Sequence, residues 1–164
     1  MFSNNKMVKK LDSNTFKNVV TYTPLVSIDL IVCNSKKQIL LGLRNNRPAK
    51  GYWFVPGGRV YKDETFDIAF QRLTTDELGV TYDNRDKKFI GYYQHFYQDN
   101  FSDENFTTHY VVISYLIEKD IDISKLPLEQ HKYYKWWDIN KILSSSEVHE
   151  NTKAYFLNNQ YHSW

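Results

Sequence analysis

The chain has 164 residues, enough for one domain with a buried core. Its formal net charge is only +2, which gives no bulk indication of a nucleic-acid partner. A lone cysteine, Cys33, excludes a disulfide framework and a cysteine metal site, and without a signal peptide or a membrane-length apolar run we expect a soluble, cytoplasmic protein with no membrane contact.

The N-terminal part predicts one helix and then a buried strand. Residues 11–20 suit a short helix with a capping Asp or Ser, which ends before Pro24. Residues 25–32 are rich in Val, Ile and Leu, which is typical of a strand buried on both faces. Asp29 lies inside this apolar run. A buried carboxylate needs a partner, so Asp29 is either a paired structural residue or an acceptor for a ligand hydroxyl.

The next segment predicts a second strand and then a glycine-rich turn. Residues 34–37 predict a hairpin turn, and residues 38–44 predict the strand that follows, with Arg44 at its end. Residues 51–55 predict a short aromatic strand. We expect this strand to lead into a Pro-Gly-Gly turn at 56–58 and then into a loop with acidic and basic side chains.

A helix is predicted after this loop. Apolar residues recur with helical spacing at Phe66, Ala69, Phe70 and Leu73. Thr65 is a suitable N-cap, and Gly79 can end the helix because glycine adopts positive φ. Asp76 and Glu77 fall in the last turn, where carboxylates oppose the helix dipole unless a cation compensates. The segment is therefore either a loop and helix with solvated charges or a place where oxygen ligands hold a divalent metal.

The second half of the chain alternates strands with short helices, which together with the first half indicates an α+β or sandwich-like arrangement. His95 lies in a strand predicted over 89–96. The other predicted elements are strands at 108–117 and 133–137 and helices at 138–143 and 151–159. His131 falls in the predicted loop before the last strand, where a histidine is more often a surface residue.

Residues 58–80 resemble the Nudix box, G-x5-E-x7-R-E-U-x-E-E-x-G-U, in which U is aliphatic. The positions in register with it are Gly58, Glu64, Arg72, Glu77, Gly79 and Val80. The positions that depart from it are Leu73, Thr74 and Asp76. The resemblance implies the Nudix fold, a mixed β-sheet between α-helices, as a single domain over residues 1–164 with 1–21 as an N-terminal extension. Glu64 and Arg72 would form an internal ion pair that shapes the loop.

Segments outside the box resemble one branch of the family, the GDP-mannose mannosyl hydrolases. This similarity is carried by residues 24–27, 46–60, 62–65, 94–97, 99–102, 106–112 and 129–131. It implies hydrolysis of a GDP-sugar, GDP-mannose or GDP-glucose, to GDP and free sugar, with water attacking sugar C1 and inverting it. Attack at an anomeric carbon passes through an oxocarbenium-like state, so the water needs a general base and the departing GDP needs its charge neutralised.

The resemblance also implies a metal site. Glu77, the backbone carbonyl of Gly57 and the side-chain oxygen of Gln130 would hold Mg²⁺ or Mn²⁺, which prefer hard oxygen donors. Leu73 stands where a metal-binding Glu belongs in the box. This departure fits the branch, because fewer carboxylates hold fewer metals, and one metal on the diphosphate suffices when phosphorus is not the electrophile.

Roles at the reacting groups follow from the same resemblance. The residues that would bind the substrate are Asp29, Arg44, Arg59, His95 and Tyr110. His131 would be the general base, and Arg44 and Arg59 would clamp the diphosphate and stabilise the departing GDP. Asp29 and His95 would bind sugar hydroxyls. Tyr110 would contact the phosphates or the leaving group, unless it is a core aromatic residue with a satisfied hydroxyl.

Two alternatives remain open. One is a Nudix pyrophosphatase that attacks a nucleoside diphosphate sugar at phosphorus, against which Leu73 counts. The other is a non-catalytic nucleotide-sugar-binding module, against which Glu77, Gln130 and His131 count because binding alone needs no base. The family resemblance further implies a homodimer, with the N-terminal segment near the partner's nucleotide site.

Overall fold

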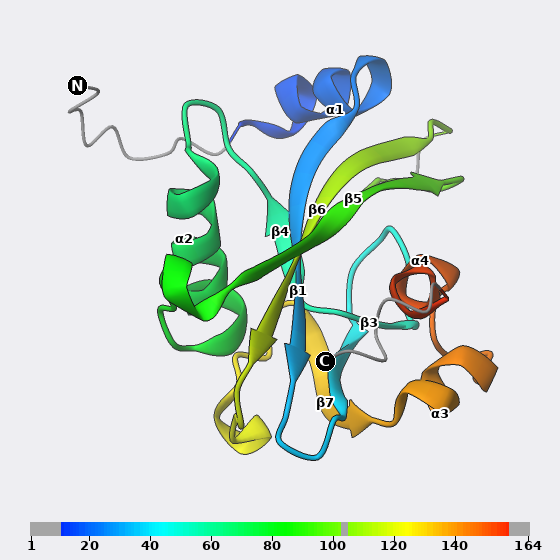
Figure 1. Cartoon of the computed structure of the whole chain (residues 1–164). Helices are drawn as coiled ribbons and strands as arrows, with labels where there is room; N and C mark the ends of the chain where they lie inside the picture. Colours follow the sequence, from blue (N-terminus) through cyan, green and yellow to red (C-terminus); the bar gives the residue numbers. More distant parts are fainter. Residues whose placement is uncertain (1–10, 103–104, 158–164) are drawn as a thin grey trace.

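The computed structural model of the chain describes residues 11–102 and 105–157 and consists of one mixed β-sheet with helices on both faces (Figure 1). The strands are β1 (Leu25–Cys33), β2 (Ile39–Arg44), β3 (Trp53–Phe54), β4 (Gly57–Arg59), β5 (Lys88–Tyr97), β6 (Thr108–Glu118) and β7 (His131–Trp137). They follow the order β3-β2-β1-β6-β5, with β4 paired to β1 and β7 paired to β2. β1 and β6 run parallel, and the other pairs are antiparallel. This arrangement confirms the predicted α+β class.

Helices cover both faces of the sheet. The helices are α1 (Ser13–Tyr22), α2 (Phe66–Leu78), α3 (Ile139–Ser144) and α4 (Glu150–Lys153), with short 3-10 turns η1 (Asn84–Asp86), η2 (Ile123–Lys125) and η3 (Ala154–Phe156). In Figure 1, α2 lies on one side of the sheet and α3 and α4 on the other. Each side holds its own apolar cluster, so the sheet is buried between two layers.

β1 contributes to both clusters because side chains alternate along a strand. Ile28 and Leu30 pack toward α2, whereas Ile31 and Cys33 pack in the cluster beside α3. The apolar run is therefore buried on both faces, as predicted. The same alternation places Asp29 on the side opposite α2.

Two local predictions were wrong. The turn expected at 56–58 is absent, because Gly57 and Gly58 belong to strand β4, which pairs with β1 from Arg59 back to Gly57. Gly57 makes this pairing possible, because a Cβ there would lie 2.5 Å from the carbonyl oxygen of Ile28. His131 was expected in a loop but begins β7, where it pairs with Arg44 of β2.

The helix ends also differ slightly from the predictions. Asp12 caps α1, as expected, but α1 extends to Tyr22. Phe66, expected on the apolar face of α2, is 47% exposed because it is the first residue of the helix. The helix predicted over 151–159 is the pair α4 and η3, and its last two positions lie outside the described residues.

Candidate active site

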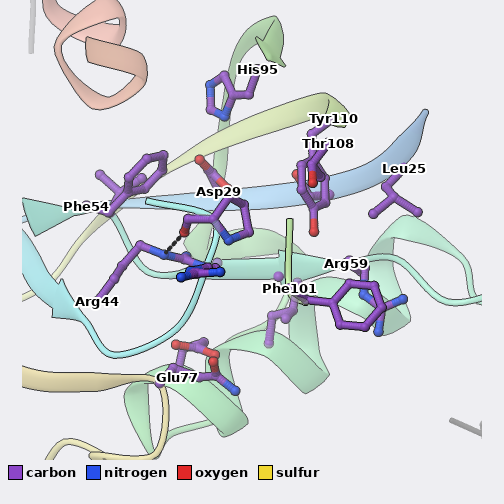
Figure 2. A pocket seen from close by; sticks show the side chains of 18 of the residues that line it. Leu25, Asp29, Arg44, Phe54, Arg59, Glu77, His95, Phe101, Thr108 and Tyr110 are labelled. Atoms are coloured by element: carbon purple, nitrogen blue, oxygen red, sulfur yellow. Dashed lines mark hydrogen bonds between the residues drawn. The ribbon is translucent and has the colours of Figure 1, made fainter. Parts of the chain in front are cut away.

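A cleft of about 640 Å³ is bordered by the central strands and the end of α2. This is the size of an ordinary small-molecule site. All the sequence-predicted site residues line it, namely Asp29, Arg44, Gly57, Arg59, Glu77, His95, Tyr110, Gln130 and His131. Figure 2 shows Arg44 between Asp29 and Glu77, with His95 beyond Asp29. The fold thus brings together residues that come from seven separate segments of the chain.

α2 carries the box and begins and ends as its sequence predicts. The backbone N–H of Ile68 donates to the hydroxyl of Thr65 at 3.2 Å, and Gly79 ends the helix with φ 70°. Glu64, just before the helix, accepts from Arg72 Nε at 2.7 Å and from the backbone N–H of Tyr61 at 2.9 Å. The predicted ion pair is therefore present, and it fixes the loop before α2.

Glu77, in the last turn of α2, lacks such partners. It is 6% exposed, and its Oε2 accepts no hydrogen bond within the described part of the chain. Burial raises the pKa of this carboxyl to about 7, although the charge of Arg44 opposes the shift. A buried carboxylate with an unpartnered oxygen is suited to a cation.

The surrounding donors fit a divalent metal with one carboxylate ligand. Gly57 and Gln130 line the same cleft as Glu77 and offer carbonyl and amide oxygens, which are hard donors. Across residues 11–102 and 105–157, no three His, Cys, Asp or Glu side chains gather into a metal cluster. A metal here would therefore be held mainly by neutral oxygens.

His131 lies directly over Gly42 of β2, where a Cβ would meet the imidazole ring at 2.5 Å. Its Nδ1 is 3.1 Å from the hydroxyl of Tyr134 and 3.6 Å from Oε2 of Glu77. The Tyr134 hydroxyl donates its one proton to the carbonyl of Pro127 at 3.0 Å. With that proton committed, Nδ1 of His131 is assigned a proton of its own, which it donates to the Tyr134 oxygen.

This tautomer leaves Nε2 of His131 with a free lone pair. The atom is buried and accepts no hydrogen bond from the residues that the structure describes. Burial lowers the pKa of His131 to about 3, and the charge of Arg44 acts in the same direction. The ring is therefore neutral, and its Nε2 is a buried acceptor without a partner among the described residues.

Two arginines approach the cleft from different strands. Arg44, at the end of β2, donates from Nε to the carbonyl of Pro48 at 2.9 Å. Arg59, in β4, places its guanidinium 4.0 Å from the ring centroid of Phe16 in α1. Phe16 also packs against Phe101 at 4.7 Å, and both rings line the cleft. Sequence reasoning does not connect Phe16 with the site, because nothing local links α1 to the cleft.

The far end of the cleft holds a buried polar group. Oδ2 of Asp29 accepts from the hydroxyl of Tyr155 at 2.6 Å, so Tyr155 is the partner that Asp29 was expected to need. Burial raises the pKa of Asp29 to about 7, against the hydrogen bond from Tyr155, and lowers that of His95 to about 4. Tyr110 of β6 pairs with His95 of β5, and burial raises the pKa of Tyr110.

Residues 23–159 match the NUDIX domain. The chain belongs to the Nudix family. The low-salt glycan biosynthesis protein Agl8 of Haloferax volcanii is 35% identical over 119 residues, which cover 71% of this Nudix chain and 73% of Agl8. Both findings confirm the family prediction.

Solved structures confirm the Nudix fold. The MutT protein from Methanosarcina mazei Go1 superposes with a TM-score of 0.67 at 24% identity, over 82% of this chain and 92% of that one. The NUDIX domain of Shewanella oneidensis NrtR, complexed with ADP ribose, gives a TM-score of 0.62 at 17% identity, over 89% and 90%. At these identities the likeness concerns the fold alone.

Nudix hydrolases generally use a divalent metal such as Mg²⁺, which agrees with the oxygen donors around Glu77. In the described ranges, the helices are all too short or too polar to cross a bilayer.

Proposed function

We propose that this Nudix protein hydrolyses a GDP-sugar, GDP-mannose or GDP-glucose, to GDP and free sugar by attack of water at sugar C1 with inversion. The observation that carries this proposal is Nε2 of His131, a buried proton acceptor without a partner in the described structure, on a side chain that lines the same cleft as Glu77. A binding module has no use for such a base. The relation to Agl8, named as a glycan biosynthesis protein, supports a carbohydrate substrate.

In this mechanism, His131 takes a proton from the attacking water at Nε2. The positive charge that forms on the ring is stabilised by the Glu77 carboxylate 3.6 Å from Nδ1 and by the hydrogen bond to Tyr134. Such general base catalysis is typically worth ~10²–10⁴ in rate. The neutral ring is the form that the reaction needs at the start.

The leaving group is GDP, and its developing charge is met by the arginines. Arg44 and Arg59 line the cleft and are suited to bidentate contacts with a diphosphate. Glu77, the carbonyl of Gly57 and the amide oxygen of Gln130 would hold Mg²⁺ or Mn²⁺, which as a Lewis acid neutralises phosphate charge. Asp29 and His95 would bind sugar hydroxyls, and Tyr110 would contact the phosphates.

The test is hydrolysis of GDP-mannose with Mg²⁺ in ¹⁸O-labelled water, with the products identified by mass spectrometry and the first sugar anomer by NMR. Unlabelled GDP and labelled β-mannose are expected. GMP and mannose 1-phosphate, with label on either phosphate, would instead establish attack at phosphorus. If GDP-mannose is stable, GDP-glucose is the second substrate to test, and stability of both would overturn the proposal.

The role of His131 predicts a specific loss in the His131→Gln variant. We expect kcat to fall by roughly 10²–10⁴ with GDP-mannose binding nearly unchanged, because the amide cannot accept the proton. Steady-state kinetics and calorimetric binding check this. His109→Gln is the matched control, because His109 lies in β6 outside the cleft and stacks on Phe96. Weaker binding at an unchanged kcat would show that His131 is not the general base.

Homodimer formation stays a prediction from the family resemblance. Sedimentation of the full chain would decide it.

A further inference from the structure

Tyr155 connects two of the residues proposed to bind the sugar. Its hydroxyl lies 2.6 Å from Oδ2 of Asp29 and 3.2 Å from Nε2 of His95. Tyr155 is fully buried in η3, and it does not line the cleft. It therefore cannot touch a ligand, and its hydroxyl acts through the two side chains that it bonds.

The protons in this group can be assigned. A phenol has one proton, and Tyr155 donates it to Oδ2 of Asp29 in the shorter of its two contacts. The contact with His95 then requires a proton on Nε2, which donates to the Tyr155 oxygen. Nδ1 of His95 consequently carries a lone pair.

Two acceptors remain available to a ligand. Asp29 and His95 line the cleft, and within the described ranges neither Oδ1 of Asp29 nor Nδ1 of His95 is engaged in a hydrogen bond. Both side chains bond one oxygen, so they are close neighbours. Such a pair of acceptors suits two hydroxyl groups of one sugar, each of which can donate one proton.

We propose that Tyr155 is a positioning residue, which orients Asp29 and holds His95 with its proton on Nε2, so that the sugar subsite accepts hydrogen bonds from two hydroxyl groups of the sugar. The identity of the ligand rests on the proposed function, whereas the hydrogen-bonded arrangement does not. A deoxy sugar that lacks one of the two hydroxyls is expected to be a poorer substrate, because it leaves a buried acceptor unpaired.

Tyr155→Phe removes the hydroxyl and keeps the ring. The ring packs edge-on against Tyr93 at 4.6 Å and beside Phe156 at 6.4 Å, and phenylalanine preserves both contacts. Tyr115→Phe is the matched control. Tyr115 is also a buried tyrosine, but it lies in the cluster on the α2 side of the sheet and outside the cleft.

Two measurements on the full chain test the proposal. In wild-type protein, ¹⁵N NMR of His95 is expected to show the Nε2–H tautomer, with the signal lost or changed in Tyr155→Phe and retained in Tyr115→Phe. The KM for GDP-mannose is expected to rise roughly ten- to a hundredfold in Tyr155→Phe, since hydrogen bonds to a charged group are lost. Inhibition by GDP alone should change less than about twofold, because GDP lacks the sugar.

Each outcome has a separate meaning. An Nδ1–H tautomer in the wild type, or a Tyr155→Phe variant with unchanged His95 signals and KM, overturns the role of Tyr155. Equal losses of GDP-mannose and GDP affinity would also overturn it, since they indicate general structural damage. If the wild type does not hydrolyse GDP-sugars, the proposed function fails, and the NMR measurement still decides the arrangement of Tyr155 and His95, even if the variant does not fold.

Discussion

The two buried glutamates of the box differ in their partners rather than in their burial. Glu64, with its side chain 1% exposed, bonds to the guanidinium of Arg72 and to a backbone N–H. Glu77, with its side chain 7% exposed, has an oxygen without any hydrogen bond in the described structure. Burial alone therefore does not mark a site residue. The distinguishing feature is a buried charge that the protein leaves unpaired.

The position of each glutamate relative to α2 agrees with this difference. Glu64 precedes the positive end of the helix, where a carboxylate is favourable, and Glu77 lies at the negative end, where it is unfavourable. Glu64 should therefore contribute to stability, and Glu77 should reduce it until a cation binds. Four substitutions test this comparison.

Glu77→Gln is expected to have the largest effect. We expect activity with Mg²⁺ to fall by about 10²–10⁴, as for the loss of a group that acts on the transition state. Metal-free protein should become more resistant to urea, because a buried unpaired charge is gone. Mg²⁺ should raise the urea midpoint of the wild type and leave that of the variant unchanged. Full activity in the variant would make Glu77 a structural residue.

Leu73→Glu restores the carboxylate that the box pattern contains. Leu73 is 3% exposed and packs in the cluster under α2, and a Cβ on Gly58 would lie 2.7 Å from its Cδ2. We expect metal-free protein to lose roughly 3–5 kcal/mol of unfolding free energy, because the new charge is buried without a partner. The products should stay GDP and free sugar. Appearance of GMP and a sugar phosphate would show that this position selects the bond cleaved.

Glu64→Gln should act mainly on stability. We expect a loss of roughly 2–3 kcal/mol in urea unfolding, because the charge-assisted bonds to Arg72 are weakened. Arg72 keeps its bond to the carbonyl of Arg59 at 2.8 Å, so the loop should still form. Activity should fall much less than in Glu77→Gln. A larger loss of activity than in Glu77→Gln would contradict the assignment of Glu64 to stability and of Glu77 to the site.

Asp76→Asn should have the smallest effect. Its side chain is 57% exposed and lies 3.4 Å from Arg72, in a contact between partly exposed groups. We expect a change within about 0.5 kcal/mol in unfolding free energy and little change in kcat. Loss of Mg²⁺ dependence in this variant would place Asp76 at the metal.

Features whose signals are local could be predicted from the sequence. The caps of α2 at Thr65 and Gly79 depend on residues a few positions apart, so spacing suffices, whereas the pair Glu64–Arg72 follows from the resemblance to the Nudix box. The two-sided burial of β1 likewise follows from one apolar run.

Features that depend on distant contacts could not be predicted in this way. β4 exists because Gly57 lets two backbones approach, and His131 lies in a strand because β7 pairs with β2. Tyr134 and Tyr155 lie within hydrogen-bond distance of the two histidines of the cleft, yet they are two of 13 tyrosines. The sequence indicates that Asp29 needs a partner but cannot select which hydroxyl supplies it.

Gly42 limits which substitutions the chain tolerates beside His131. A Cβ there would lie 2.5 Å from ring carbons of His131, so even alanine requires the imidazole to move. A chain with that one added methyl group would keep every charged and polar side chain of the cleft and still misalign its proposed base. Inactive relatives that still bind the ligand are therefore expected to include chains that differ from active ones at the position of Gly42, a residue that itself takes no part in the reaction.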